Sequence, residues 1–197
     1  MTDWPGRWLT GWARKVLPDP LPAARAPKTD LPPSRALCIL RNGPASFAGR
    51  KIGVLVTNGT EAYVLSAVEA AAEQEHVLVE YIAPVVGVAA SDGSAVKVSQ
   101  QLGGGPSVLY DAVVLAPSAR EADNLARSPA ARDFVADAHA HCKFVGYTSS
   151  AGPVLTSAGV DDQLDDGFMN LTAANAPEFV ARCGQLRHWA RATSALV

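Results

Sequence analysis

The spacing of hydrophobic and polar positions changes at about residue 51. From there, near-continuous apolar runs of strand length alternate with segments whose apolar residues recur every three or four positions. The runs KIGVLVT, VLVEYIAP, YDAVVLAPS and KFVGYT are typical of strands buried on both faces of a sheet. Two short runs on either side of Asp92–Gly93 indicate a β-hairpin, because Asp-Gly is a favoured two-residue turn.

Two segments between the expected strands are typical of amphipathic helices. Residues 61–74 are rich in alanine, and their apolar stripe consists of Val64, Leu65, Val68 and Ala72. Residues 129–142 follow Ser128, a residue type favoured at the N-cap, and begin with a proline, which is favoured in the first turn. Their inward-facing positions are expected to be Phe134, Val135 and Ala138.

A third helix is expected near the C-terminus, capped by Asn175, begun by Pro177 and running to about residue 192. Its core-facing stripe would comprise Phe179, Val180, Cys183, Leu186 and Trp189. The alternation of strands and helices predicts an α/β fold. We expect a flavodoxin-like, doubly wound, mainly parallel sheet with helices on both faces and a small β-hairpin.

The first 48 residues have a different composition. Residues 17–33 are rich in proline, which favours extended backbone and predicts a linker. Before it, Trp4, Trp8 and Trp12 stand four residues apart and would share one face of a helix, which makes them candidate protein-interaction residues. They would dock on the chain's own domain or on a second copy, or else anchor a groove or a membrane surface. The expected organisation is an amphipathic arm (1–16), a linker (17–48), a domain (49–192) and a tail (193–197).

Composition and charge narrow the classes of function. The 197 residues carry a net charge of −2 at pH 7, which provides no general attraction for nucleic acid or an anionic membrane. Because no apolar run is long enough to span a bilayer and no signal-peptide pattern is present, we expect a cytoplasmic protein. The cysteines Cys38, Cys142 and Cys183 are far apart in sequence, so they are interpreted as buried thiols and not as a disulfide framework or a zinc site.

Ligands of open α/β sheets bind beyond the carboxyl ends of the strands. The candidate loops are therefore Thr57–Glu61, Pro117–Arg120 and Tyr147–Pro153. The first lacks the dense hydroxyl array of a flavin phosphate loop, and the glycines of residues 102–106 lack the lysine of a P-loop. On a helix, His139, His141 and Cys142 would point to different sides and could not share a metal ion. No cofactor and no metal are therefore predicted.

The segment VGYTSSAGPVL, residues 145–155, has the form of the turn on which many α/β enzymes carry a nucleophile. Ser149 or Ser150 would need a general base and donors for an oxyanion. No histidine follows within several residues, and SSAGP is not the G-x-S-x-G elbow of hydrolases. Four downstream carboxylates could approach these serines in space: Asp161, Asp162, Asp165 and Asp166. The segment that carries them, DDQLDD, is nevertheless typical of a solvated loop.

A resemblance to one family runs from about residue 17 to 191 and includes the proline-rich connector. The C-terminal domain of large-subunit haem catalases is similar in its wording to four phrases of this chain: DLPPSRALCILRNGPASFAGRKIGVLVTNG, LGGGPSVLYDAVVLAPS, SPAARDFVADAHAHCKFVGYTSSAGPVLTSAGV and DDGFMNL. The resemblance implies a fold of the class I glutamine-amidotransferase-like, PfpI-type superfamily, with no established reaction of its own in catalases. It also implies a homodimer, since PfpI-type domains commonly self-associate.

Active members of that superfamily hold a cysteine at the elbow, followed closely by glycine, and an acid in the helix after the first strand. By resemblance, Ser150 stands in the place of the cysteine, with Gly152 after it, and Val64 stands at or near the place of the acid. Glu61 comes about one helical turn earlier, and Cys142 lies at the opposite end of the strand. The resemblance therefore implies an emptied site with no catalytic residue, because both the thiolate and its partner are replaced.

Catalases bind haem through a distal histidine and asparagine and a proximal tyrosine on a large domain that does not precede Leu17 here. We interpret the chain as a stand-alone relative or a piece of a longer product. The preferred function is a non-enzymatic domain for protein stabilisation or interaction, with holdase-type chaperone behaviour towards client proteins under oxidative stress. The alternatives are a divergent PfpI-type hydrolase using Ser150 or Thr148, and a regulatory partner or fragment of a haem catalase, the parent of which disproportionates hydrogen peroxide.

Overall fold

The structure, a computed structural model, describes residues 22, 24–26, 28, 30–32, 34–38, 41–44 and 46–194. The chain divides into two compact units, residues 1–38 and 39–197. The described residues of the first unit form a turn at 35–37 and no helix or strand. The candidate interaction residues Trp4, Trp8 and Trp12 lie outside the described residues.

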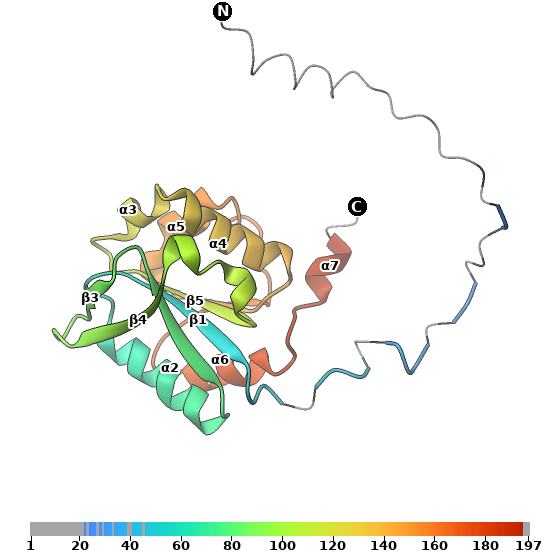
Figure 1. The fold of residues 1–197 in the computed structure, drawn as a ribbon, viewed down its shortest axis with the longest axis horizontal. Coiled ribbons are helices and arrows are strands. Elements are labelled where there is room, and N and C mark those ends of the chain that lie inside the picture. Colours follow the sequence, from blue (N-terminus) through green and yellow to red (C-terminus); the bar gives the residue numbers. More distant parts are fainter. Residues whose placement is uncertain are drawn as a thin grey trace, which may run out of the picture. The chain divides into compact units, whose positions relative to one another are not determined.

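The second unit is built on a seven-stranded sheet in the order β3-β4-β2-β1-β5-β6-β7 (Figure 1). All neighbouring strands are parallel except β3 and β4, which form the predicted antiparallel hairpin. The predicted doubly wound, mainly parallel sheet is confirmed. The strands are β1 (Lys51–Val56), β2 (Leu78–Ala83), β3 (Gly87–Ala89), β4 (Ala95–Gln101), β5 (Ala112–Ala116), β6 (Val145–Tyr147) and β7 (Phe168–Asn170).

Helices cover both faces of the sheet, as predicted (Figure 1). One face carries α2 (Ala62–Gln74) and α6 (Ala176–Cys183), and the other carries α3 (Ala122–Ala126), α4 (Pro129–Ala140) and α5 (Gly152–Ser157). The predicted apolar stripes of α2 and α4 are confirmed, because all of their members are buried: Val64, Leu65, Val68, Ala72, Phe134, Val135 and Ala138.

The central strand β1 has an apolar sequence without alternation because both of its faces are buried. Ile52, Val54 and Val56 belong to the hydrophobic core on the side of α2 and α6, whereas Leu55 belongs to the core under α4 and α5. Both faces of the strand are therefore covered, and neither set of side chains can be polar. Among the described residues, no helix has the length and apolar character needed to cross a bilayer.

The prediction of one long C-terminal helix is wrong. α6 ends at Cys183, Leu186 adopts a left-handed φ of 65°, and a separate short helix, α7 (Ala190–Ser194), follows. The predicted stripe fails at Trp189, which is 37% exposed, while Arg191 in α7 is buried. A left-handed residue cannot continue a right-handed helix, so the residues after it no longer share the stripe of α6.

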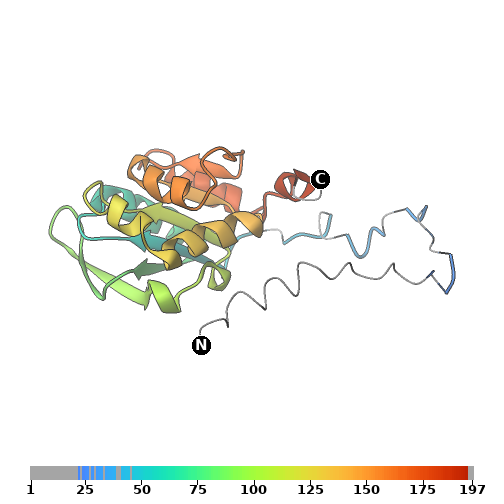
Figure 2. The same cartoon turned by 90° about the horizontal axis from the view of Figure 1, so that it is seen from above.

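The predicted N-cap residues Ser128 and Asn175 occupy the N-cap positions of α4 and α6, but neither side chain makes a cap hydrogen bond. Asn175 instead accepts the Thr172 N–H through Oδ1 at 2.8 Å. At the other end of the unit, the turn of the β3–β4 hairpin caps the N-terminus of α2. Ser91 Oγ accepts the Ala62 N–H at the start of α2 at 3.1 Å. In Figures 1 and 2 this hairpin and α7 lie at opposite ends of the unit.

Candidate functional site

The three candidate loops follow β1, β5 and β6, which are neighbours in the sheet. Their residues therefore meet at the carboxyl edge of the sheet, at the point where the strand order reverses between β1 and β5. In doubly wound sheets this switch point is where ligands bind. The sequence placed the loops correctly, but it could not show how their side chains are used.

The switch point between β1 and β5 is occupied by hydrogen bonds among the protein's own hydroxyl groups. Thr57 Oγ1 donates to Ser118 Oγ at 3.3 Å and accepts the Ser118 N–H at 2.8 Å. Thr60 Oγ1 donates to the Ala116 carbonyl at 2.7 Å and accepts the Thr57 N–H at 3.0 Å. All three hydroxyl side chains are at least nine-tenths buried. They hold the two loops together and do not present a row of donors to a phosphate.

The turn after β6 has ordinary backbone geometry. Thr148 is extended, with φ −79° and ψ 158°, and buried, and residues Ser149–Ala151 form a 3-10 turn that leads directly into α5. The non-glycine residues with positive φ in the described chain are His76, Cys142 and Leu186, so neither Ser149 nor Ser150 has that conformation. A nucleophile elbow is a sharp, strained turn that exposes the nucleophile. The candidate turn lacks that strain.

No histidine accompanies Ser150. His76 precedes β2, His139 and His141 precede β6, and the His188 N–H donates to the Cys142 carbonyl at 2.7 Å. All four histidines of the chain thus belong to the amino edge of the sheet, whereas Ser150 follows the carboxyl end of β6. A strand rises about 3.3 Å per residue, so β5, with five residues, separates the two edges by about 16 Å. The histidines are too far away to act as a general base for Ser150.

Val64 and Glu61 are the two positions that the resemblance relates to the acid of active superfamily members. Val64 is 2% exposed and is part of the hydrophobic core. Glu61 is exposed, and its Oε2 accepts a hydrogen bond from Ser91 Oγ at 3.4 Å. Its carboxylate is therefore engaged with the β3–β4 hairpin.

The acidic loop after α5 is only partly solvated, which corrects the prediction for Asp165. Arg191 donates to both oxygens of this half-buried carboxylate at 2.7 Å, and the Gly167 N–H donates to Oδ1 at 2.8 Å. Burial alone would raise the pKa of Asp165, but the hydrogen bonds from Arg191 and Gly167 hold it below its ordinary value. The other members behave as a surface loop, with Asp161, Asp162 and Asp166 exposed.

The two cysteines of the second unit lie away from the turn after β6. Cys142 and Cys183 are buried, as predicted, and Cys38 is partly exposed. Burial raises the pKa of the Cys183 thiol far above its ordinary range, so it stays protonated. Among the described residues, no group of three histidine, cysteine or acidic side chains is arranged to hold a metal ion.

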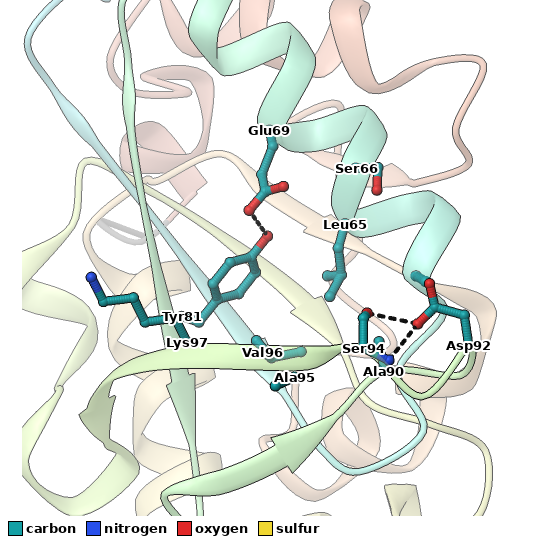
Figure 3. A pocket seen from close by; sticks show the side chains of 11 residues that line it. Leu65, Ser66, Glu69, Tyr81, Ala90, Asp92, Ser94, Ala95, Val96 and Lys97 are labelled. Carbon is teal, nitrogen blue, oxygen red and sulfur yellow. Dashed lines mark hydrogen bonds between the residues drawn. The ribbon is translucent and has the colours of Figure 1, made fainter.

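A cavity of about 230 Å³ lies between α2 and the β3–β4 hairpin (Figure 3). At its wall, Tyr81 donates to Glu69 Oε1 at 2.7 Å, and burial together with this carboxylate keeps the phenol protonated by raising its pKa. Asp92 lies at the hairpin end and accepts both the N–H and the hydroxyl of Ser94. The cavity lies beside β2 and β4, so it does not include Ser150, which is on the far side of β1 and β5. No motif in the sequence indicates this cavity, because its walls come from separate elements.

Comparison with known proteins gives the family. The profile of the C-terminal domain found in long catalases matches residues 48–193. Catalase C of Rhizobium meliloti (strain 1021) is 50% identical over 182 residues, which are 91% of this chain and 26% of that catalase. Catalase HPII of Mycobacterium avium is 32% identical over 182 residues, 84% of this chain and again 26% of the relative. The chain therefore spans about a quarter of the length of these catalases.

Solved structures show the same fold at low sequence identity. A DJ-1 superfamily protein from Salmonella typhimurium matches with a TM-score of 0.57 and 22% identity, covering 74% of this chain and 98% of that one. Oxidized DJ-1 of Toxoplasma gondii matches with a TM-score of 0.56 and 15% identity, covering 75% and 98%. The sequence match over residues 48–193 and the agreement in fold lead to one conclusion: the chain belongs to the family of C-terminal domains of long catalases.

Proposed function

We propose that this chain is a non-catalytic module that acts by binding other proteins in the cytoplasm, as a homodimer, in an oxidative-stress context. The observation that carries the proposal is the isolation of Ser150. The serine stands in an unstrained turn, and every histidine of the chain lies at the opposite edge of the sheet. Because no histidine can act as its general base, Ser150 lacks the usual means of activation, so a role in binding is better supported than one in hydrolysis.

The family supplies the first partner to consider. Its relatives are catalases about four times as long as the part that matches, so the natural neighbour of such a domain is a catalase body. We infer that the module stabilises a haem catalase by contact. A holdase action on unfolding clients is the broader form of the same proposal. Exposed apolar side chains that could take part include Val85, Val86 and Val108.

The test is heat inactivation of a long haem catalase from which the C-terminal domain has been removed. Peroxide disproportionation is followed with and without an equal molarity of this chain, and an unrelated protein of similar size serves as the control. We expect slower inactivation only with this chain, together with co-elution in size-exclusion chromatography. Equal rates and separate elution would refute contact with catalase.

The holdase form is tested by light scattering of a heat-aggregating client enzyme. Suppression by the wild type that fades in a Trp4→Ala/Trp8→Ala/Trp12→Ala variant would support client binding through the arm. If neither protein suppresses aggregation, the holdase form is wrong.

Hydrolysis is the competing function, and Ser150 tests it. Purified protein is assayed with activated ester and peptide substrates beside Ser150→Ala and Thr148→Ala variants. We expect background rates in all three. Turnover by the wild type that Ser150→Ala abolishes would refute a non-catalytic module.

A further inference from the structure

A second cleft lies at the amino edge of the sheet. A cleft of about 600 Å³ lies between residues 41–44 and the segment Gly184–Ala190 that follows α6. This volume is within the range of small-molecule sites, about 300–1,000 Å³. The cleft is at the opposite edge from Ser150, so it belongs to a different part of the fold.

The residues that line the cleft include two arginines and two ring side chains. Arg41 and Arg187 contribute guanidinium groups, Gln185 and His188 contribute further polar groups, and Trp189 contributes an aromatic residue that is partly exposed. Within the described part of the chain, no aspartate or glutamate lines this cleft. Its lining therefore has an excess of positive charge.

The carboxylates nearby are already engaged by other groups. Asp111 accepts a hydrogen bond from Arg50 Nη1 at 3.1 Å and another from the Lys51 N–H at 3.2 Å. Asp165 uses both oxygens for Arg191, and its Oδ2 is 3.8 Å from His188 Nε2. Neither carboxylate makes an ion pair with Arg41 or Arg187 in the structure.

The buried Lys143 is a further cation close to Arg187. Its ammonium group donates to the carbonyl oxygens of Ser107 and Tyr110, and its side chain is almost fully buried. Desolvation and, next, repulsion from Arg187 lower its pKa to about 8. The carboxylates of Asp111 and Asp137 act in the opposite direction, but the pKa of Lys143 stays below its ordinary value.

Arg187 is held in place by the backbone and keeps donors for a ligand. Its Nη1 donates to the Leu186 carbonyl at 2.7 Å and to the Asp111 carbonyl at 3.1 Å. A guanidinium has five N–H donors, so two bonds through one nitrogen leave the other nitrogens available. A fixed guanidinium loses little conformational freedom when it pairs with an oxyanion.

We propose that this cleft binds a small organic anion, a carboxylate or phosphate compound, whose oxygens pair with Arg41 and Arg187 while its less polar part contacts Trp189. The site goes beyond the proposed function, because it requires neither contact with catalase nor a client protein. It assigns a ligand class to the amino edge of the fold.

The test is isothermal titration of the full chain with three probes: citrate, adenosine monophosphate and inorganic phosphate. We expect saturable binding of at least one organic probe with a dissociation constant of about 1 mM or lower. Arg41→Gln and Arg187→Gln should each weaken it at least about tenfold, which corresponds to about 1.4 kcal/mol. Arg182→Gln is the matched control, because Arg182 pairs with Glu178 on α6 and does not line the cleft.

The two organic probes distinguish a carboxylate ligand from a phosphate ligand. Inorganic phosphate that binds as tightly as both of them would remove the contact with Trp189 from the proposal, and a Trp189→Ala variant with unchanged affinity would do the same. Circular dichroism checks that each variant is folded. If Arg187→Gln is not folded, the exposed Arg41 carries the test alone. No saturable heat from any probe up to about 10 mM, or equal affinity in wild type and folded cleft variants, overturns the proposal.

Discussion

The glycine at the centre of β1 permits a close approach that no other residue would allow. A Cβ atom on Gly53 would lie 2.5 Å from Tyr110 Cδ2, 2.6 Å from Tyr110 Cγ and 3.0 Å from Ile82 Cδ1. Carbon atoms in proteins pack at about 3.5–4.0 Å, so the ring would have to withdraw by about 1 Å. Tyr110 is 2% exposed and packs beside Phe134 at 6.4 Å between ring centroids, so it has little room to move.

The free-energy cost of Gly53→Ala follows from these contacts. Overpacking a dense core costs about 1–3 kcal/mol, and the short distances to a confined ring place this site near about 2.5 kcal/mol. Replacing glycine in a strand restores about 0.7 kcal/mol through the unfolded state. The expected net loss is about 2 kcal/mol, which corresponds to a fall in Tm of about 4–8 °C for a domain of this size.

Urea unfolding followed by circular dichroism measures this loss. Gly87→Ala in β3 is the control, because a Cβ there meets no atom within 4 Å and its φ is ordinary. It should change stability by less than about 0.5 kcal/mol. A double-mutant cycle with Tyr110→Leu should show that most of the cost disappears when the ring is absent. If Gly53→Ala is as stable as Gly87→Ala, the packing argument is wrong.

Three further changes test the charged groups of the amino edge. The pKa of Lys143 is lowered to about 8 in the fold, so the unfolded chain binds more protons than the folded chain above that pH. Wild-type stability should therefore rise relative to Lys143→Met between about pH 8 and 10.5. Urea midpoints of the two proteins that change in the same way with pH would contradict this. The lowered pKa of Asp165 predicts that the advantage of wild type over Asp165→Asn is full above about pH 4 and shrinks as acid titrates the folded carboxyl, which acid unfolding measures. Arg191→Lys loses the two-pronged pairing with Asp165 and should cost about 2 kcal/mol in urea unfolding, whereas wild-type stability would show that the pairing contributes nothing.

The strands and the first two long helices could be predicted because their signal is local and repeated. β1 and β5 are covered on both faces, so their apolar runs are nearly continuous. The stripe of α2 recurs at the helical period over thirteen residues. The loops at the carboxyl edge then follow from the topology alone.

The C-terminal region could not be predicted from hydrophobic spacing. Leu186 and Trp189 continue the spacing of the α6 stripe. However, α6 ends at Cys183 and the backbone at Leu186 is left-handed, so these two residues do not share a helix face with the stripe. Arg191 is buried because Asp165, 26 residues away, neutralises it, and Phe168 lies 4.9 Å from its guanidinium carbon. No periodic pattern contains such a pair. β7 was missed because only Phe168 of its three residues is buried, so the strand has no apolar run.

The position of the candidate site could be predicted from the sequence, but the hydrogen bonding of its side chains could not. The sequence showed hydroxyl residues at Thr57, Thr60 and Ser118, but whether they offer donors to a ligand or bond to one another depends on the meeting of two loops. The cleft at the amino edge gave no signal for the same reason. Arg41 and Arg187 are distant in sequence and are brought together only when the segment after α6 folds back beside residues 41–44.

The two edges of one sheet thus have opposite properties. At the carboxyl edge, the buried hydroxyl groups of Thr57, Thr60 and Ser118 bond to one another and to the backbone, and no histidine lies beside Ser150. At the amino edge, Arg41 and the anchored guanidinium of Arg187 line an open cleft that has no aspartate or glutamate among its described lining residues. The chain enters the domain at this same edge, through residues 41–44. Recognition of a small organic anion is therefore better supported at the amino edge than at the turn that carries Ser150.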